Sequence, residues 1–256
     1  MHASERSDLI SNILRERDFV SLQDLCTRLK ASPATIRRDL ERLEASGKLK
    51  RVHGGARATE NHAGTQLLGV PFELNRQRNA RAKAAIGRAA AKLCRAGDAI
   101  IIDGGTTTFQ MCPHLSRTNI QVLTNSLHIV NALLSNPKAQ IALPGGTIYR
   151  EQNIVLDPFE DCGFSHFHAT TMFTGAAALG PRGVMQSDAI LVQAERRFMT
   201  CSDRLVVLVD SSKFRTSANL VLCALSDVDV VVTDSGVSKA ELAPLRAAGI
   251  EVVVAG

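Results

Sequence analysis

The sequence predicts an α/β protein of two domains, in which a small basic head precedes a larger body built on a mainly parallel sheet. Two short helix patterns joined by a tight turn lie within residues 1–57, which carry 12 Lys and Arg against 8 Asp and Glu. From residue 98 onward, continuous Val and Ile runs alternate with helix patterns, as in sheets that are covered on both faces. With 45% hydrophobic residues, a chain of 256 residues can bury a sizeable core.

The head begins with two amphipathic helix patterns. Residues 4–17 predict a first helix, whose inward side chains would be Leu9, Ile10, Ile13 and Leu14. A second helix is expected over residues 22–29, where Ser21 can act as the N-cap. Its inner face would consist of Leu22, Leu25, Cys26 and Leu29.

The third helix, residues 33–43, is the most informative stretch of the chain. Ser32 is a good N-cap, and Pro33 suits the first helical position because its missing N–H costs nothing there. The apolar stripe of this helix is Ile36, Leu40 and Leu43, and its outward face is Thr35, Arg37, Arg38 and Arg42. Arg and Thr on a helix with a buried back suit the DNA major groove. The alternative is the solvated face of an ordinary helix.

The neighbours of this helix favour DNA binding. The turn at residues 30–31 makes a helix-turn-helix with the preceding helix, and the second helix of such a motif reads DNA. Residues 47–56 predict a strand, a Gly-Gly turn and a returning strand, which would form a small basic wing. The candidate DNA-binding residues are Ser21, Ser32, Pro33, Thr35, Arg37, Arg38, Arg42, Lys48, Lys50, Arg51, His53 and Gly54.

Residues 58–70 lose periodicity and are interpreted as a linker between a domain at 1–57 and a domain at 71–256. A long helix is expected from about residue 72 to 93. Its Arg- and Ala-rich part, 76–95, would be either a second nucleic-acid surface or, as its composition favours, a solvated or subunit-contact face. Seven strands should follow, at residues 98–103, 121–124, 140–143, 170–174, 205–209, 228–232 and 251–254.

Small or polar residues follow most of these strands, and in open α/β sheets ligands bind beyond the carboxyl ends of the strands. The strand ends are Asp103-Gly104-Gly105-Thr106-Thr107-Thr108, Thr124-Asn125-Ser126, Pro144-Gly145-Gly146, Thr174-Gly175-Ala176 and Asp210-Ser211-Ser212-Lys213. Each alone is an ordinary turn. Together they predict a pocket of amides, hydroxyls and one ammonium, which suits an anionic polyhydroxy ligand such as a sugar phosphate.

Composition excludes several classes of protein. Aromatic residues make up only 4% and Trp is absent, which argues against stacking on single-stranded nucleic acid. The six cysteines are scattered without a C-x-x-C pair, so we expect reduced thiols and a cytoplasmic protein. The charged N-terminus is not a signal peptide, and no apolar run reaches the roughly 18 residues of a membrane span.

No metal site and no cofactor are expected. Cys162, His166 and His168 include residue types that bind zinc, but no second cluster with ligand spacing accompanies them. They are therefore interpreted as loop and strand residues.

The head resembles the DeoR/GlpR family of bacterial repressors. The resemblance runs from Arg6 through Ile10 and Leu14 to Ser32, Thr35, Ile36, Arg37, Arg38, Asp39 and Leu40, and includes Arg51-Val52-His53-Gly54-Gly55-Ala56 as the wing. Residues 72–256 resemble the sensor domain of that family, whose fold is related to ribose-5-phosphate isomerases and CoA transferases. The matching motifs are Asp103-Gly104-Gly105-Thr106-Thr107, Thr124-Asn125-Ser126, Gly145-Gly146 with Arg150, Val209-Asp210-Ser211-Ser212-Lys213-Phe214, and Met172-Phe173-Thr174-Gly175 with Gly183, Asp188 and Glu195. The last of these leans toward the sugar-acid-phosphate branch of the family. Arg215 departs from the family, which usually has Gly there.

The resemblance implies roles for these residues. Residues 105–108 would hold a phosphate at a helix N-terminus, Asn125 and Ser126 would bind hydroxyls or the phosphate, and Lys213 would neutralise an anionic group. The carboxylates would either bind the effector or cap helices and pair with Lys. The candidate effector-binding residues are Asp103, Gly104, Gly105, Thr106, Thr107, Thr108, Thr124, Asn125, Ser126, Gly145, Gly146, Arg150, Gly175, Asp188, Glu195, Asp210 and Lys213.

We therefore expect a DNA-binding transcriptional regulator without enzymatic activity, in which a phosphorylated sugar or sugar acid releases repression of a carbohydrate-catabolism operon. It would bind a double-stranded operator as a homo-oligomer, dimer or tetramer. The alternative is a sugar-phosphate isomerase-like or CoA-transferase-like enzyme with an appended basic head, in which Lys213 and a strand-end carboxylate act as acid and base. A pure interaction module is a third class, which the polar strand ends argue against.

Overall fold

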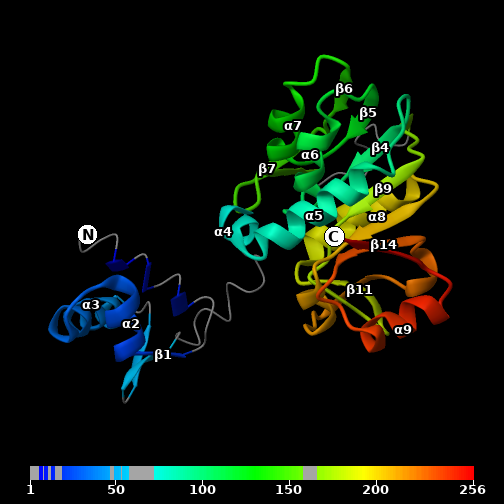
Figure 1. The fold of residues 1–256 in the computed structure, drawn as a ribbon. Coiled ribbons are helices and arrows are strands. Elements are labelled where there is room, and N and C mark those ends of the chain that lie inside the picture. The colour runs from blue at the N-terminus through cyan, green and yellow to red at the C-terminus, as the bar shows by residue number, and fades with distance from the viewer. Residues whose placement is uncertain are drawn as a thin grey trace. The chain divides into compact units, whose positions relative to one another are not determined.

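The computed structural model describes residues 6–7, 9–10, 13–14, 19–46, 49–52, 54–57, 72–157 and 166–256. The chain divides into two compact units, Met1–Leu67 and Leu68–Gly256, called here the head and the sensor unit (Figure 1). The division falls within residues 58–70, the predicted linker. Because those residues lie outside the described ranges, the linker stays a prediction.

The head contains the predicted helix-turn-helix and wing. Helices α2 (Leu22–Leu29) and α3 (Pro33–Ala45) are followed by an antiparallel hairpin of β2 (Lys50–Val52) and β3 (Gly55–Arg57). A third strand, β1 (Phe19–Ser21), pairs with β3 and was not predicted. Gly55 permits this pairing, because a Cβ there would lie 2.1 Å from the carbonyl oxygen of Val20.

A small apolar core holds the head together. The described residues of the predicted first helix, 6–7, 9–10 and 13–14, are helical. Ile10 and Leu14 pack into the core, but Leu9, which was predicted to point inward, is 41% exposed. The reason is helix geometry, since Leu9 lies about 100° around the helix from the stripe of Ile10 and Leu14. Arg6 donates from Nε to the buried Asp39 at 2.7 Å and so ties this helix to α3.

The sensor unit is built on a parallel sheet of seven strands in the order β15-β14-β12-β9-β4-β5-β6. All seven predicted strands are present, with ends that differ by a few residues. They are β4 (Ala99–Ile102), β5 (Ile120–Leu123), β6 (Ala139–Ala142), β9 (Thr171–Thr174), β12 (Leu205–Leu208), β14 (Val230–Asp234) and β15 (Glu251–Ala255).

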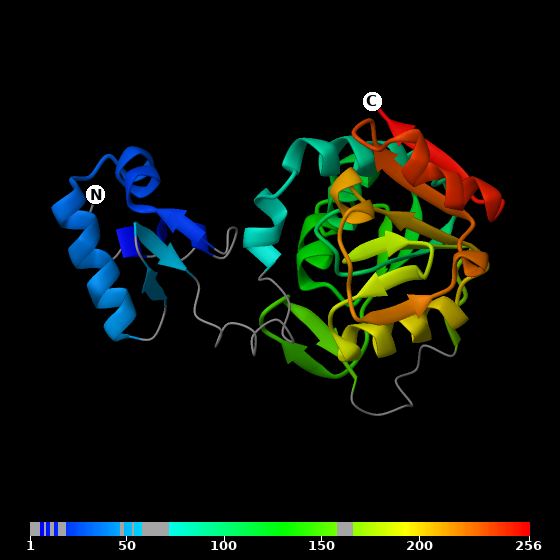
Figure 2. The same ribbon diagram turned by 90° about the horizontal axis from the view of Figure 1, so that it is seen from below.

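Both faces of the sheet are covered, which explains why its strands are apolar on both sides. One face, including Ile100 and Ile102, packs against α5 (Ala80–Ala91), α6 (Cys112–Leu115) and α7 (Leu127–Leu133). The other face, including Ile101, packs against α8 (Ala189–Thr200) and α9 (Lys239–Ala247). Figure 2 shows α5 and α8 on opposite sides of the sheet.

Two small antiparallel sheets accompany the main sheet. Strands β10 (Ala178–Gly180), β11 (Gly183–Gln186) and β13 (Leu220–Cys223) form an antiparallel sheet. Strands β7 (Thr147–Tyr149) and β8 (Ile154–Leu156) form a separate hairpin. None of these five strands was predicted.

The predicted long helix at about 72–93 is wrong in one respect, because it is broken. It consists of α4 (Phe72–Gln77) and α5, separated by a turn in which Asn79 has a left-handed φ of 51°. The Asn79 amide group does not cap α5 but donates to Asp210 Oδ1 at 2.9 Å. This contact holds the corner between the two helices against the loop that follows β12.

Candidate functional site

The outward face of α3 has the composition that DNA reading needs. Ser32 Oγ accepts from the amide of Thr35 at 3.2 Å and so caps the helix as predicted. Arg37, Arg38 and Arg42 are exposed, and within the described part of the chain their guanidinium groups form no hydrogen bond or ion pair. Three free guanidinium groups on one face can contact phosphates or guanine edges.

The wing carries basic residues next to this helix. Lys50 is exposed, whereas the Arg51 guanidinium lies 2.9 Å from Glu41 Oε1 on α3 and so also braces the wing. Gly54 forms the turn with a φ of +82°. Ser21 caps α2, with Oγ accepting from the Asp24 amide at 3.1 Å. Lys48 and His53 lie outside the described residues, so their roles stay predictions.

A pocket of about 200 Å³ lies at the carboxyl ends of the strands in the sensor unit. Going outward from β4 the sheet continues to β5 and β6, and going outward from β9 it continues to β12, β14 and β15. The strand order therefore reverses between β4 and β9, which is where open α/β sheets bind ligands. The predicted effector residues that line this pocket are Asp103, Gly104, Gly105, Thr106, Thr107, Asn125, Gly175, Glu195 and Lys213.

Asp103 joins the two central strands at this point. Its Oδ1 accepts from the Gly105 amide at 2.9 Å and from Thr108 Oγ1 at 2.8 Å. Its Oδ2 accepts from Thr174 Oγ1 at 2.6 Å and from the Gly175 amide at 2.8 Å. With four donors already bound, this carboxylate organises the turn after β4 and has little capacity left for a ligand.

Asn125 differs from Asp103 in that its side-chain oxygen accepts no hydrogen bond from the described residues. It is 5% exposed, it lines the pocket, and its Oδ1 is buried without a hydrogen-bond partner among the described residues. Its two neighbours are used locally, since Thr124 Oγ1 accepts from the Ser126 amide and Ser126 Oγ caps α7. Because a buried unpaired acceptor is costly, Asn125 Oδ1 is suited to a ligand hydroxyl.

Several predicted effector residues do not line the pocket and have other contacts. Asp188 caps α8 through the amide of Ile190 at 2.9 Å. Asp210 caps the short 3₁₀ helix Ser211–Phe214. Gly146 has a φ of +139°, and a Cβ there would lie 2.4 Å from the Leu156 carbonyl oxygen. The residues outside the pocket lining are Thr108, Thr124, Ser126, Gly145, Gly146, Arg150, Asp188 and Asp210.

Glu195 of α8 is a buried carboxyl group in the pocket wall. Burial raises its pKa well above the usual value, and the nearby Asp103 carboxylate adds to the rise. The Gln186 side-chain amide donates to both carboxyl oxygens, at 2.9 and 3.0 Å, and so opposes it. A carboxyl group that holds its proton can donate to a ligand oxygen.

The α4–α5 corner contributes pocket residues that the sequence reasoning missed, namely Phe72, Asn75, Arg78 and Lys83. Lys83 is only 2% exposed, and its ammonium donates to Thr106 Oγ1 at 2.9 Å. A signal was available in the sequence, because Lys83 shares the inward stripe of α5 with Ile86 and Ala90. A lysine on a buried stripe needs a special partner.

The wall of this pocket contains three cationic side chains beside the carboxyl groups of Asp103 and Glu195. Arg78, Lys83 and Lys213 all line it. In the part of the chain that the structure describes, the Arg78 and Lys213 side chains form no hydrogen bond or ion pair. The arrangement can bind an anion through cations, hydroxyls and backbone amides.

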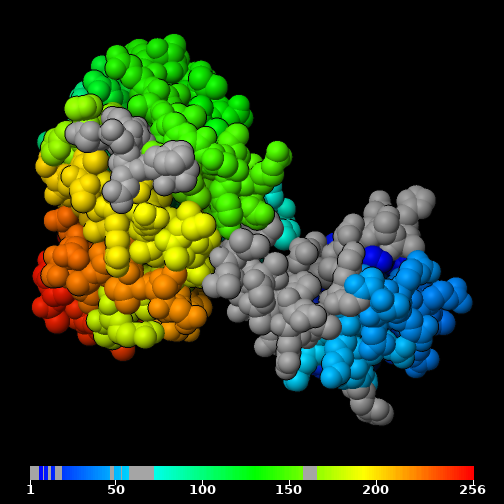
Figure 3. All heavy atoms as spheres, turned by 180° about the vertical axis from the view of Figure 1, so that it is seen from behind, coloured from blue at the N-terminus to red at the C-terminus, as the bar shows by residue number. Residues whose placement is uncertain are grey.

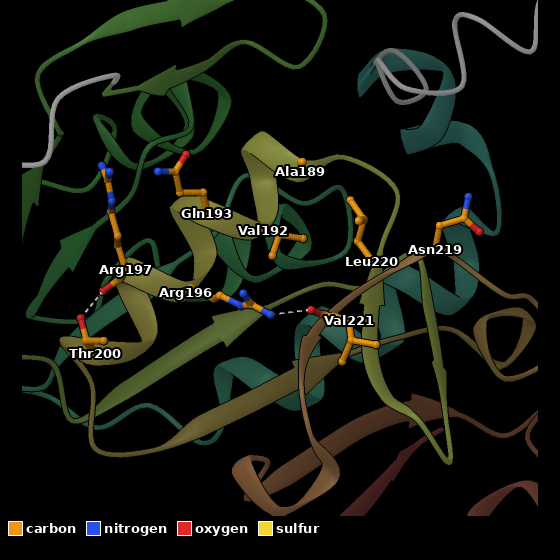
Figure 4. A pocket seen from close by; sticks show the side chains of 9 residues that line it. All are labelled: Ala189, Val192, Gln193, Arg196, Arg197, Thr200, Asn219, Leu220 and Val221. Atoms are coloured by element: carbon orange, nitrogen blue, oxygen red, sulfur yellow. Dashed lines mark hydrogen bonds between the residues drawn. The ribbon is translucent and has the colours of Figure 1, made fainter.

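A second hollow lies on the surface of the sensor unit between α8 and β13 (Figure 4). Its volume is about 610 Å³, and Figure 3 shows the face of the unit on which the yellow residues of α8 lie. Arg196, the cation nearest β13, is occupied there, since it donates to the carbonyl groups of Val221 and Leu222. At the strand ends, by contrast, the side chains of Arg78 and Lys213 and the buried Asn125 Oδ1 have no hydrogen-bond partner among the residues that the structure describes.

The metal alternative gains no support. Cys162 lies outside the described residues, and His168 pairs with Asp203 at 2.9 Å on the surface. No group of three metal-ligating side chains occurs among the residues that the structure covers. Within the same ranges, no helix has the length and apolar character to cross a bilayer.

The winged helix-turn-helix and the α/β unit together define a DNA-binding transcriptional regulator. Residues 6–62 match the DeoR-like helix-turn-helix domain, and residues 78–235 match the DeoR C terminal sensor domain. The chain belongs to the DeoR family. It is 29% identical over 253 residues to the HTH-type transcriptional regulator UlaR of Shigella dysenteriae serotype 1 and of Escherichia coli K12, covering 99% of both chains.

Solved structures with a similar fold include ribose 5-phosphate isomerase A of Methanocaldococcus jannaschii. That protein is 16% identical, with a TM-score of 0.38 over 51% of this chain and 52% of the isomerase. A score this low carries no functional argument. The predicted fold class, a winged helix-turn-helix followed by a mainly parallel α/β sensor domain, is confirmed by the strand topology and by both family matches.

Proposed function

We propose that this DeoR-family regulator is a repressor of a carbohydrate-catabolism operon and that a phosphorylated sugar or sugar acid releases it from its operator. The single observation that carries the proposal is the pocket at the switch point of the sheet. Its wall presents the side chains of Arg78 and Lys213, which have no partner within the described ranges, beside the hydroxyls of Thr106 and Thr107. A phosphate gains charge-assisted hydrogen bonds from such a wall.

The rest of the wall suits a polyhydroxy body attached to that phosphate. Asn125 Oδ1 can accept from one hydroxyl, and a protonated Glu195 can donate to a ligand oxygen. The UlaR proteins, which this chain resembles over nearly its whole length, are named transcriptional regulators, and this supports a regulator over an enzyme. Repression by a homo-oligomer fits a recognition helix as short as α3, because one such helix reads few bases.

The test is operator release in vitro. The operator is first selected from random double-stranded DNA with the full chain, and its affinity is measured by fluorescence anisotropy at fixed salt. Glucose 6-phosphate, ribose 5-phosphate and 6-phosphogluconate are then titrated, with the unphosphorylated compounds as matched controls. We expect at least one phosphate, and none of the controls, to release the DNA. Release by an uncharged sugar would contradict the proposal.

The enzyme alternative is tested in the same samples. Turnover of any of these sugar phosphates, followed by NMR, would favour an isomerase-like activity. Ligand-dependent DNA release without turnover favours the regulator.

A further inference from the structure

Lys83 has a buried ammonium group that forms no ion pair with any carboxylate among the described residues. Its ammonium donates to the carbonyl group of Asn75, lies 3.5 Å from Asn75 Oδ1, and donates to Thr106 Oγ1 at 2.9 Å. All these partners are neutral. Among the described residues no carboxylate lies within ion-pair distance of it. Buried charges are normally paired, because leaving one unpaired in the interior is costly.

The surroundings of this ammonium reinforce its need for an anion. The pKa of Lys83 is lowered to about 8, chiefly because the side chain is buried; the Asp210 carboxylate raises this pKa, and the Lys213 and Arg78 cations lower it. Lys83, Arg78 and Lys213 line the same pocket. An anionic group in that pocket would supply the missing negative charge to all three.

The Asn75 partner of Lys83 belongs to α4, a helix of six residues whose other contacts with the sensor unit include the Phe72 and Arg76 side chains on the Phe109 ring. Phe72 at its start stacks on His128, with the ring centroids 3.8 Å apart, and donates from its amide to the Glu151 carbonyl group at 3.3 Å. The Asn75 carbonyl, at the middle of the helix, is held by Lys83. In sequence α4 is the first described element after the segment that leads from the head.

We propose that Lys83 is an effector-binding residue that changes partners: its ammonium exchanges the Asn75 carbonyl group of α4 for the anionic group of a ligand that enters the pocket. This rests on the proposed function only in that the effector is anionic. Thr106 keeps its hydrogen bond in both states and fixes the ammonium at the pocket wall. The anion competes with the Asn75 carbonyl for the remaining donors, so binding loosens α4.

The exchange links ligand binding to the head through the polypeptide chain, because α4 is the first described element after the segment that leads from the head. A ligand can shift an equilibrium only through its different affinity for two states, and the ammonium is the group that differs between them here. When Lys83 releases the Asn75 carbonyl group, α4 loses one of the hydrogen bonds that hold it at the start of the sensor unit.

The first experiment measures binding to the full chain by calorimetry. The probes are inorganic phosphate, ribose 5-phosphate and glucose 6-phosphate, and the variant is Lys83→Met, which keeps most of the apolar stem. The matched control is Lys92→Met, at the exposed C-terminal end of the same helix and outside the pocket lining. Loss of one charge-assisted bond should weaken binding roughly 10- to 150-fold in Lys83→Met. Lys92→Met should match the wild type.

The second experiment measures hydrogen exchange of residues 72–77, which a purely structural lysine would not couple to the ligand. In the wild type, saturating ligand should speed exchange of α4, and in Lys83→Met exchange should be fast with or without ligand. Unchanged affinity in Lys83→Met, or α4 exchange that ignores the ligand in the wild type, overturns the proposal.

A third variant covers the case in which Lys83→Met does not fold by circular dichroism. Thr106→Val removes the hydroxyl that positions the ammonium while keeping the side-chain shape, and it should also weaken phosphate binding. If the wild type binds an uncharged sugar and none of the three anions, the proposed function itself fails. If Lys83→Met and Thr106→Val bind the phosphates as tightly as the wild type does, the proposed role of Lys83 is wrong while the proposed function stands.

Discussion

At the scale of single residues, the sensor unit separates side chains that build the pocket from those left free to bind. Asp103 has four hydrogen-bond donors from two strands and is used up by the fold. The same wall holds Asn125 Oδ1 and the charged groups of Arg78 and Lys213, for which the described part of the chain offers no hydrogen-bond partner. Sequence reasoning treats all strand-end polar residues alike, because it cannot show which neighbouring donors already satisfy them.

Lys83 should couple ligand binding to proton uptake. With a pKa of about 8, roughly half of the free molecules carry this proton at pH 8. An anionic ligand favours the charged form and raises the pKa, so binding at pH 8 should take up about half a proton. Calorimetry at pH 8 in two buffers of different ionisation enthalpy measures this, since a sugar phosphate, with a pKa of about 6, is already ionised.

At pH 6 Lys83 is protonated in both states and takes up no proton, whereas the phosphate of the ligand, with a pKa of about 6, is only half ionised and can itself release a proton on binding. The proton uptake by Lys83 is therefore the difference between the wild type and Lys83→Met at pH 8. Lys83→Met should abolish it, whereas Glu195→Gln tests whether the other buried titratable group in the wall contributes. Binding heats at pH 8 that do not depend on the buffer would contradict the assignment. Lys83 also affects stability in the absence of ligand, because its pKa is about 8 in the folded protein and 10.5 in the unfolded chain. Between these two pH values the unfolded chain binds more protons than the folded protein, so the free energy of unfolding rises with pH there.

At the scale of elements, the pattern of apolar runs predicted the strands of the main sheet because its central strands β4, β9, β12 and β14 are buried on both faces. It missed the three-residue strands β7 and β8. Ile148 of β7 is 53% exposed, and the apolar run of β8, Ile154–Leu156, is only three residues long. It also missed the break between α4 and α5, which depends on a contact of Asn79 with Asp210 that lies 131 positions away. Arg215, where the family usually has Gly, has a φ of −105° and so needs no glycine.

Helix α3 should carry most of the sequence reading by the head. Arg37→Ala or Arg38→Ala should weaken operator binding by about 1–3 kcal/mol if the side chain reads a base, and should leave effector binding unchanged. The measurement is anisotropy at fixed salt, with Arg28→Ala as the control, because Arg28 lies on α2 and pairs with Asp24 at 3.2 Å. Wild-type affinity in both α3 variants would mean that another surface contacts DNA.

At the scale of the whole molecule, the chain joins two units with separate cores, and this separation shapes what a pocket mutation can do. The head has its own apolar cluster, and the two clusters that cover the sheet belong to the sensor unit. A change in the pocket should therefore leave the DNA-reading surface intact. Effector control then depends on a coupling free energy between the two sites, typically about 1–3 kcal/mol.

Lys213→Ala should consequently produce a repressor that the effector releases poorly. Lys213 lines the pocket from the loop after β12, and its side chain has no hydrogen bond or ion pair among the described residues. Its removal leaves a bound dianion short of one charge-assisted bond worth about 1.5–3 kcal/mol, which corresponds to a loss of affinity of roughly 10- to 150-fold. Calorimetry with the releasing sugar phosphate, run beside operator release on the same samples, measures both effects.

Lys239→Ala is the matched control, because Lys239 is an exposed lysine at the start of α9 and does not line the pocket. Binding and release like the wild type in Lys213→Ala would move the effector site away from the strand ends. Loss of operator binding in the absence of effector would instead assign Lys213 to the fold or to subunit assembly. Retained operator binding with weakened release is the one result that places this lysine in the effector site and keeps the two units functionally distinct.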